Sequence, residues 1–326
     1  MLNVPSTDIQ GSVEQALRLE RAGCQILRAA IPNKEAVALI PAIKERVSIP
    51  LVADIHFDYK LALEAVAAGI DKIRIKPGNI GDDSRVKAVA DACRQKNIPI
   101  RIGVNSGSLE KHILAKYGSP TPEALVESAL YHVSLLEKFD FTDIVISLKA
   151  SSVDLTVRAY ELMAQQCPYP LHLGVTEAGT ARMGLVKSAI GIGSLLLDGI
   201  GDTIRVSLTG DPVPEVEAGL SILRAVGLRR DAVDIVSCPT CGRTCIDVAG
   251  IVARVRAETA HLRTPLKIAV MGCVVNGPGE AQDADIGIAG GKSGGALFGH
   301  GQLLRTVRGD LAQALLEEIR RMSENG

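Results

Sequence analysis

The sequence contains no tryptophan, and phenylalanine, tyrosine and tryptophan together make up only 3% of its 326 residues. Aromatic side chains are typical of surfaces that bind protein partners or stack nucleic-acid bases, so their scarcity argues against such a surface. The 32 glycines indicate many tight turns and close backbone approaches instead. This composition is typical of α/β enzymes.

An excess of charge is also absent. The formal net charge of -1 gives no general attraction to nucleic acid or to anionic membranes, so any anion-binding site must be local. No apolar run approaches the length of a membrane span, and the opening MLNVPSTDIQ lacks the basic and apolar regions of a signal peptide. We therefore predict a cytoplasmic protein with no nucleic-acid or membrane partner.

In that reducing compartment, seven cysteines are poor candidates for a disulfide framework. Clustered cysteines are better interpreted as metal ligands or redox groups. Cys24, Cys93 and Cys167 lie in or near predicted helices and strands of the first part of the chain, where we expect them to pack. The other four lie in the last hundred or so residues.

The first two-thirds of the chain repeats a short β-branched run, a turn, and an amphipathic stretch with apolar residues three and four apart. One such stretch runs through Val86, Val89, Ala90 and Cys93, and another begins at Thr121 with Pro122 as its first helical residue. The pattern predicts a series of parallel strands joined by helices. The strands centre on Ile26, Val52, Ile73, Ile102, Val145, Leu173 and Ile204.

Such a series forms either an open, doubly wound sheet or a closed eight-stranded barrel. Seven strands are one short of closure. The chain begins directly with a loop and the helix through Val13 and Leu17, so we expect the missing element to be the first strand.

The character of the sequence changes after Leu228. We predict that residues 1–228 form the substrate-binding unit and that residues 229–326 form a small α+β domain that holds a metal site. Strands are expected at 234–238 and 267–273, and helices through Ile251 and Leu315.

In this second domain, Cys238-Pro-Thr-Cys241 follows one predicted strand and Cys273 ends the other, so three thiolates are offered from two strand ends. A C-x-x-C pair alone is also found in zinc sites and thioredoxin-like motifs, and a structural zinc site remains an alternative. However, an Asn-Gly-Pro-Gly turn follows Cys273 and directs Glu280 back toward the same site. A carboxylate is an exchangeable ligand, which favours a reactive iron–sulfur site over a structural one. Cys245 is a spare thiol in this interpretation.

Cationic residues occupy strand positions that usually carry apolar side chains, and we expect each to lie near the carboxyl end of its strand. Any one of them could be salt-bridged or extend its charged group to solvent. Together, they would make burial costly unless a ligand with several negative charges is bound, and a diphosphate fits this requirement. The set is Arg28, Arg74, Lys76, Arg101, Lys149 and Arg205.

Three candidate acid–base groups follow strands at the same predicted edge: Asp54, His56 and Glu177. Asp54 could instead cap a helix, and Glu177 could form a structural ion pair.

Several motifs occur together, in order: Lys-Pro-Gly-Asn at 76–79, Arg-Ile-Gly-Val-Asn at 101–105, Gly-Val-Thr-Glu-Ala-Gly at 174–179, Cys-Pro-Thr-Cys-Gly-Arg at 238–243, and Gly-Cys-Val-Val-Asn-Gly-Pro-Gly-Glu at 272–280. Over essentially its whole length, the chain resembles the 4-hydroxy-3-methylbut-2-enyl diphosphate synthase family. The resemblance implies a TIM-type (β/α) barrel followed by a small [4Fe-4S] domain, as in the two-domain bacterial form. Members begin with a strand that this chain lacks.

The resemblance also implies a reaction. Members reduce 2-C-methyl-D-erythritol 2,4-cyclodiphosphate by two electrons, opening the ring and losing water, in the non-mevalonate isoprenoid pathway. Flavodoxin or ferredoxin would supply the electrons. Two chains would form a homodimer in which the cluster domain of one closes over the barrel of the other. The alternative from the residues alone is a non-redox lyase or transferase acting on a phosphorylated compound, with a zinc-stabilised second domain.

The family's functional residues carry over to matching positions of this sequence. Glu177 corresponds to the proton-handling or hydroxyl-binding carboxylate, with Asp54 and His56 as neighbours. The implied cluster ligands are Cys238, Cys241, Cys273 and the exchangeable Glu280. The implied diphosphate ligands are Arg28, Arg74, Arg101, Lys149 and Arg205, assisted by Asn105 and Ser147.

Overall fold

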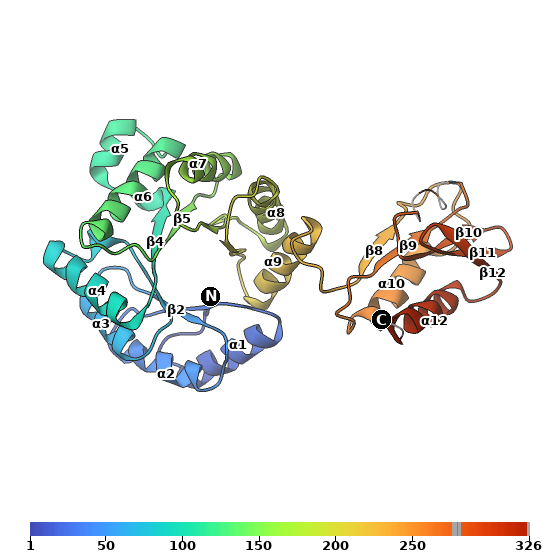
Figure 1. Cartoon of the computed structure of the whole chain (residues 1–326), viewed down its shortest axis with the longest axis horizontal. Coiled ribbons are helices and arrows are strands. Elements are labelled where there is room, and N and C mark those ends of the chain that lie inside the picture. Colours follow the sequence, from blue (N-terminus) through green and yellow to red (C-terminus); the bar gives the residue numbers. More distant parts are fainter. Residues whose placement is uncertain (276–278, 280–281, 325–326) are drawn as a thin grey trace. The chain divides into compact units, whose positions relative to one another are not determined.

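The computed structural model describes residues 1–275, 279 and 282–324. The chain divides into two units, Met1–Leu228 and Arg229–Gly326, each with its own hydrophobic core (Figure 1).

The first unit is a TIM-type (β/α) barrel, as predicted. Five consecutive strands pair in parallel, and a bridge from Ile146 to Leu171 leads to two further parallel strands. The strands are β1 (Leu27–Ala30), β2 (Leu51–Asp54), β3 (Lys72–Ile75), β4 (Ile100–Asn105), β5 (Ile144–Lys149), β6 (His172–Leu173) and β7 (Thr203–Ile204).

No ladder joins β7 to β1 within the described part of the chain. The backbone N–H of Leu2 donates to the carbonyl oxygen of Arg28 at 2.9 Å, so the first residues run beside β1.

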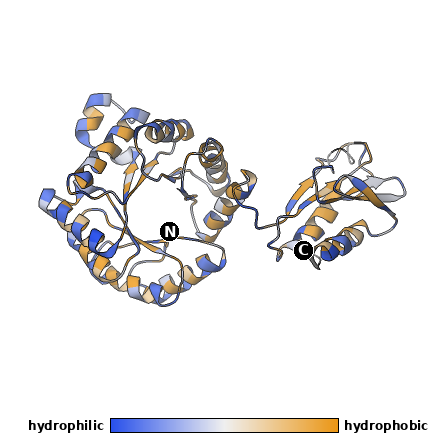
Figure 2. Ribbon diagram, viewed as in Figure 1, coloured by the Kyte–Doolittle hydropathy of each residue, from blue (hydrophilic) through white to orange (hydrophobic). Residues whose placement is uncertain are grey.

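Helices surround these strands, and their hydrophobic faces point inward while their hydrophilic faces point outward (Figure 2). The predicted helix through Val86 and Cys93 is confirmed, with its apolar residues buried. The predicted cap is also confirmed, because the Thr121 hydroxyl accepts a hydrogen bond from the Ala124 N–H. The helices are α1 (Ile9–Arg21), α2 (Leu39–Lys44), α3 (Tyr59–Ala67), α4 (Asp83–Lys96), α5 (Lys111–Tyr117), α6 (Pro122–Glu137), α7 (Val153–Gln166), α8 (Ala181–Leu197) and α9 (Val213–Ala225), with single 3-10 turns at η1 (Glu35–Ala38), η2 (Pro77–Asn79) and η3 (Ser106–Ser108).

The alternation of side chains along the strands positions the site. Ile73 and Ile75 on β3, and Ile100 and Ile102 on β4, are fully buried in the core shared with the helices. Because side chains alternate along a strand, the residues between them point into the barrel. The barrel interior is therefore lined by polar and charged residues, while its outer face supplies the hydrophobic core.

The second unit is a small α+β domain, as predicted. Its sheet has the order β12-β11-β10-β9-β8, in which β8, β9 and β10 are parallel and the other pairings are antiparallel. Two helices pack on this sheet. The elements are β8 (Asp234–Ser237), β9 (Lys267–Met271), β10 (Ile286–Gly291), β11 (Gly294–Gly299), β12 (Gln302–Val307), α10 (Val248–Thr259) and α12 (Leu311–Glu324).

Candidate active site

Five cationic side chains converge inside the barrel. Arg74, Arg101 and Lys149 are buried, with only 7%, 5% and 6% of their surface exposed. Arg28 and Arg101 are the second residues of β1 and β4, so their predicted placement near the carboxyl ends of these strands was wrong. They lie lower in the barrel than Lys149, which ends β5. The cations therefore span the depth of the interior rather than only its edge.

Asp54 is the carboxylate at the centre of this cluster. It accepts hydrogen bonds from Arg28 Nη2 at 2.8 Å and from Arg74 Nη1 at 3.0 Å, and its side chain is buried. Burial would raise the pKa of Asp54, but a hydrogen bond with His56 and the charges of Arg28 and Arg74 hold it well below its usual range. Asp54 is therefore not a helix cap. The cap of α3 is Asp58.

Positive charge exceeds negative charge in the cluster. Burial, together with Arg28 and Arg74, lowers the pKa of Arg101 to about 9, and burial with Arg205 and Arg101 lowers the pKa of Lys149 well below its ordinary value. Arg28 Nε, Arg101 Nε, Arg205 Nε and Lys149 Nζ are buried and have no hydrogen-bond partner among the described residues. Such donors are costly to leave unpaired, so the cluster favours a ligand that carries several negative charges.

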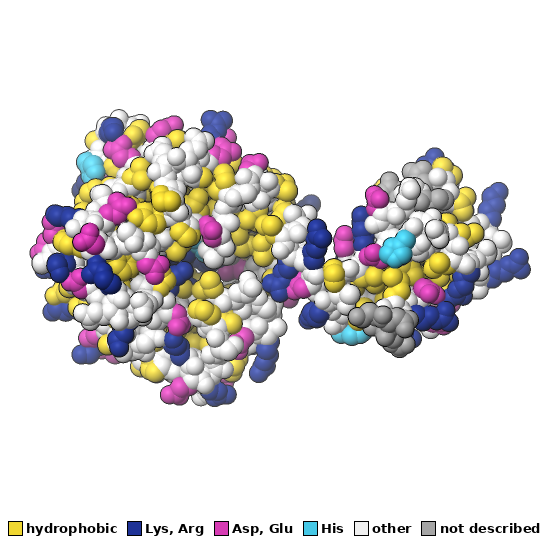
Figure 3. All heavy atoms as spheres, in the orientation of Figure 1, with side chains coloured by type: hydrophobic (Ala, Val, Ile, Leu, Met, Phe, Trp, Pro, Cys, Tyr) yellow, Lys and Arg dark blue, Asp and Glu magenta, His cyan; other side chains and the backbone are white. Residues whose placement is uncertain are grey.

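This attraction for anions is local. Acidic and basic side chains are interspersed over the visible face of the barrel unit rather than separated into patches of one sign (Figure 3).

Two glycines that were not predicted as part of the site make room for the cations. A Cβ on Gly103 would lie 2.8 Å from Arg74 Nη2, and one on Gly174 would lie 2.8 Å from Lys149 Nζ. Any larger residue would therefore displace a cationic side chain. The available signal was a glycine within a predicted strand, which often marks a close approach.

The upper edge of the barrel carries the remaining polar candidates. Asn105 pairs in register with Lys149, and buried Ser147 pairs with Gly103. Glu177 follows β6 with a φ of 51°, a left-handed conformation that is uncommon for residues other than glycine and that clusters at functional sites. Its side chain is exposed and makes no ion pair with any described residue, in contrast to the structural pair considered above.

His56 stands at the same edge, 58% exposed and 3.7 Å from Asp54 through Nε2. Lys76 lies directly after β3 and donates to the carbonyl oxygen of Ser108 at 2.6 Å, so its amine is already engaged.

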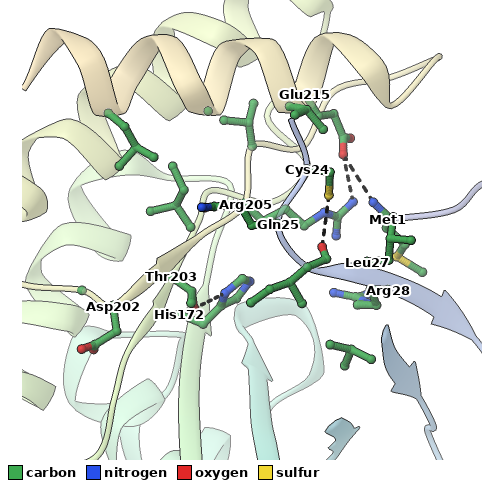
Figure 4. Close-up of a pocket in the computed structure, with 18 of the residues that line it drawn as sticks. Met1, Cys24, Gln25, Leu27, Arg28, His172, Asp202, Thr203, Arg205 and Glu215 are labelled. Atoms are coloured by element: carbon green, nitrogen blue, oxygen red, sulfur yellow. Dashed lines mark hydrogen bonds and ion pairs between the residues drawn. The ribbon is translucent and has the colours of Figure 1, made fainter. Parts of the chain in front are cut away.

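A cavity of about 280 Å³ lies between β1 and β7, and Arg28, Arg101 and Arg205 line it (Figure 4). Sequence reasoning missed His172, which also lines this cavity and whose Nδ1 lies 2.8 Å from the Thr203 hydroxyl. Glu215 stands 3.7 Å from Arg205 and partly balances its charge. The cation cluster is thus open toward both ends of the barrel.

In the second unit, Cys238 and Cys273 follow the ends of the neighbouring parallel strands β8 and β9. The Gly272 N–H donates to Cys238 Sγ at 3.2 Å, a contact that would also stabilise a thiolate. Cys241 is exposed, and its own N–H donates to the Thr244 hydroxyl at 3.0 Å.

Cys245 is also exposed, and its Sγ lies 3.2 Å from the carbonyl oxygen of Arg243. No disulfide joins the seven cysteines, all of which are described. Glu280 lies outside the described residues.

Among the residues that are described, no three His, Cys, Asp or Glu side chains already form a metal-binding group. The donor chemistry nevertheless fits an iron–sulfur cluster, because soft thiolates are presented from two adjacent strand ends and one sulfur accepts a backbone N–H.

These features define a class: a (β/α)-barrel enzyme for an anionic substrate, with a second domain whose thiols suit a redox metal centre. None of its described helices could span a bilayer.

Comparisons with known proteins identify the family. Residues 1–220 match the model of the GcpE TIM-barrel domain, and residues 234–321 match that of the GcpE protein C-terminal domain. Proteins named 4-hydroxy-3-methylbut-2-en-1-yl diphosphate synthase (flavodoxin) are 58% identical in Caldanaerobacter subterraneus subsp. tengcongensis, 56% in Fusobacterium nucleatum and 54% in Clostridium perfringens. These alignments cover 99%, 99% and 98% of this chain and 91%, 90% and 92% of the relatives.

The chain belongs to the 4-hydroxy-3-methylbut-2-en-1-yl diphosphate synthase family of iron–sulfur oxidoreductases, which confirms the resemblance seen in the sequence.

Proposed function

We propose that the chain catalyses the two-electron reductive ring opening and dehydration of 2-C-methyl-D-erythritol 2,4-cyclodiphosphate to (E)-4-hydroxy-3-methylbut-2-enyl diphosphate, in the non-mevalonate pathway. The reaction takes up two electrons and two protons and releases one water. The observation that carries the proposal is the cluster of buried cations with unpartnered N–H groups, which suits a cyclic diphosphate. The printed names of the relatives favour this function over a non-redox lyase or transferase.

In this proposal the diphosphate is held by the cations of the barrel. Arginine is suited to this role because its planar guanidinium donates two parallel hydrogen bonds to phosphate oxygens. Asn105 and Ser147 would add neutral polar contacts. The proposed ligands are Arg28, Arg74, Arg101, Lys149 and Arg205.

Three groups at the barrel edge would handle protons and hydroxyls. Glu177 is exposed in a left-handed conformation, so its carboxylate is accessible to a substrate hydroxyl. Asp54 stays ionised, because Arg28 and Arg74 hold it, and it therefore acts as an orienting anion for the cations rather than as an acid. His56, beside Asp54 and largely exposed, can exchange protons with solvent.

The second domain would hold a [4Fe-4S] cluster through Cys238, Cys241, Cys273 and Glu280, and when bound the cluster would supply the electrons one at a time. Three thiolates would keep it attached, while a carboxylate is the most readily exchanged of the four ligands.

We further propose that flavodoxin, which the relatives' names include, is the electron donor, with ferredoxin as the other candidate. The working form would be a cytoplasmic homodimer in which the barrel of one chain and the cluster domain of the other share an active site.

The test is turnover of the cyclic substrate by an anaerobically prepared sample with about four irons per chain, using a dithionite-reduced dye as donor. We expect one linear product for every two electrons consumed. An iron-loaded protein that leaves the cyclic substrate unchanged would contradict the proposal. A colourless protein with one zinc per chain would favour the lyase or transferase instead.

A further inference from the structure

A network of buried polar side chains links the loops that follow β3 and β4, next to the cation cluster. Its centre is Glu110, the residue before α5, whose side chain is 15% exposed. The carboxylate accepts hydrogen bonds from the Ser128 hydroxyl at 2.6 Å and from Lys76 Nζ at 3.3 Å, and it lies 2.9 Å from His132 Nε2. Burial would raise the pKa of Glu110, but its bonds with His132 and Ser128 keep it well below its usual range, so the group is ionised.

The protonation of His132 follows from its two contacts. The backbone N–H of Gly78 donates to His132 Nδ1 at 3.1 Å, so this nitrogen carries no proton. The ring proton is therefore on Nε2 and is donated to Glu110. His132 is completely buried, and a Cβ on Gly78 would lie only 3.0 Å from its ring. His132 thus connects the η2 turn to Glu110 in one fixed tautomer.

Lys76 forms the second connection. Its side chain is 7% exposed, and its amine donates both to the carbonyl oxygen of Ser108 at 2.6 Å and to Glu110. To bind a phosphate instead, Lys76 would have to leave a buried carboxylate with fewer partners, which is unfavourable. Lys76 therefore holds the loop after β4 to the end of β3.

These contacts act on the cation cluster through Asn105. The loop from Asn105 to Glu110 begins at the end of β4, where Asn105 pairs in register with Lys149. Ser108, which binds Lys76, also donates through its hydroxyl to the Asn105 carbonyl oxygen at 3.4 Å. A shift of this loop would move Asn105 relative to the neighbouring cation.

We propose that Glu110 is a positioning residue: with Lys76 and His132 it forms a brace that holds Asn105 and the η2 turn in place for diphosphate binding, and Lys76 serves this brace rather than contacting the substrate. The inference rests on the proposed function for its substrate and assigns to Lys76 a role different from the one the sequence predicted.

The first test compares Glu110→Gln with Glu127→Gln. Glu127 is a matched control, because it also connects α5 to α6, through Lys116 and Tyr117, but on the surface. We expect Glu110→Gln to raise KM for the cyclic substrate roughly 10- to 100-fold, with kcat per iron changed far less, since the brace acts on binding geometry. Glu127→Gln should behave as wild type. An unchanged KM with a lower kcat would mean that Glu110 only supports folding and would overturn the proposal.

A double-mutant cycle separates the two roles of Lys76. If Lys76 acts through Glu110, Lys76→Met should weaken inorganic diphosphate binding in the wild type but add little in the Glu110→Gln background. If Lys76 contacts the diphosphate itself, the two losses should add, which would contradict the brace.

A third measurement is independent of turnover. Hydrogen exchange of the Gly78 amide should be slow in the wild type and at least tenfold faster in Glu110→Gln, because His132 loses its fixed acceptor. If Glu110→Gln fails to fold, Ser128→Ala should show the same changes with smaller size. Equal exchange rates would disprove the brace, whereas a wild-type protein that protects Gly78 yet never turns over the cyclic substrate would disprove only the proposed function.

Discussion

The two units prepare for their ligands in different ways. In the barrel, the groups that await a ligand are already held in place: Asp54 and Arg74 are bonded to each other, and Gly103 leaves the space that Arg74 occupies. In the second unit, Cys238 has one backbone contact and Cys241 is exposed, with no complete metal-binding group among the described residues. The barrel therefore forms its anion site by folding, whereas the thiols depend on the metal itself to bring them together.

This contrast predicts that damage to one unit leaves the other working. The largest effect is expected for Cys273→Ala, which removes one of three thiolates and should abolish iron retention and turnover. Diphosphate binding to the barrel should stay at the wild-type level when measured by calorimetry. Cys245→Ala is the matched control and should keep its iron. Loss of diphosphate binding together with iron would show that the two sites are not independent.

Arg101→Ala should have the converse effect. Its guanidinium is buried and has an unpartnered Nε, so removing it should weaken binding of the cyclic substrate by roughly tenfold to a hundredfold. The visible absorption of the cluster should be the same as in the wild type. Arg18→Ala, which removes an exposed partner of Asp211, is the control for loss of an arginine and should bind normally. Unchanged affinity in Arg101→Ala would remove the cation cluster from the substrate site.

A smaller effect concerns protons. Burial and the neighbouring arginines lower the pKa of Lys149, and a bound diphosphate would raise it again by supplying negative charge. Binding should then take up protons, and affinity should fall as the pH rises from below the pKa of free Lys149 toward that of the bound form. Calorimetry in two buffers of different ionisation enthalpy measures this uptake. It should decrease in Lys149→Met, and an identical uptake in that variant would show that another group titrates.

The sequence was sufficient to predict those features that follow from local patterns. Alternation along the strands located Arg74 and Lys149 inside a barrel, and the spacing of Val86, Val89 and Cys93 predicted the buried face of α4. The pattern could not fix depth, which is why Arg28 and Arg101 were placed too near the carboxyl ends. Depth depends on the register between neighbouring strands, and a single strand does not contain that information.

Features that arise from contacts between distant elements were not predicted. Gly103 matters only because Arg74 crosses it from the next strand, and Glu110 matters only because Lys76, Ser128 and His132 reach it from two other elements. The glycine-rich segment of the second unit was not predicted to form strands, since glycine is depleted in them. It forms the hairpin of β10 and β11, in which Gly290 faces Gly295 and a Cβ on Gly290 would lie 2.8 Å from the Gly272 carbonyl oxygen. There, glycine permits close packing beside the cysteines.

The most direct test of the account is the electron paramagnetic resonance spectrum of the reduced, iron-loaded protein before and after addition of the cyclic diphosphate. If the cations of the barrel hold the substrate against a redox centre in the second domain, the spectrum of the wild type should change on addition and that of Arg101→Ala should change only at much higher substrate concentration. A spectrum that stays the same while calorimetry shows the substrate bound would contradict the claim that the two domains act on one molecule.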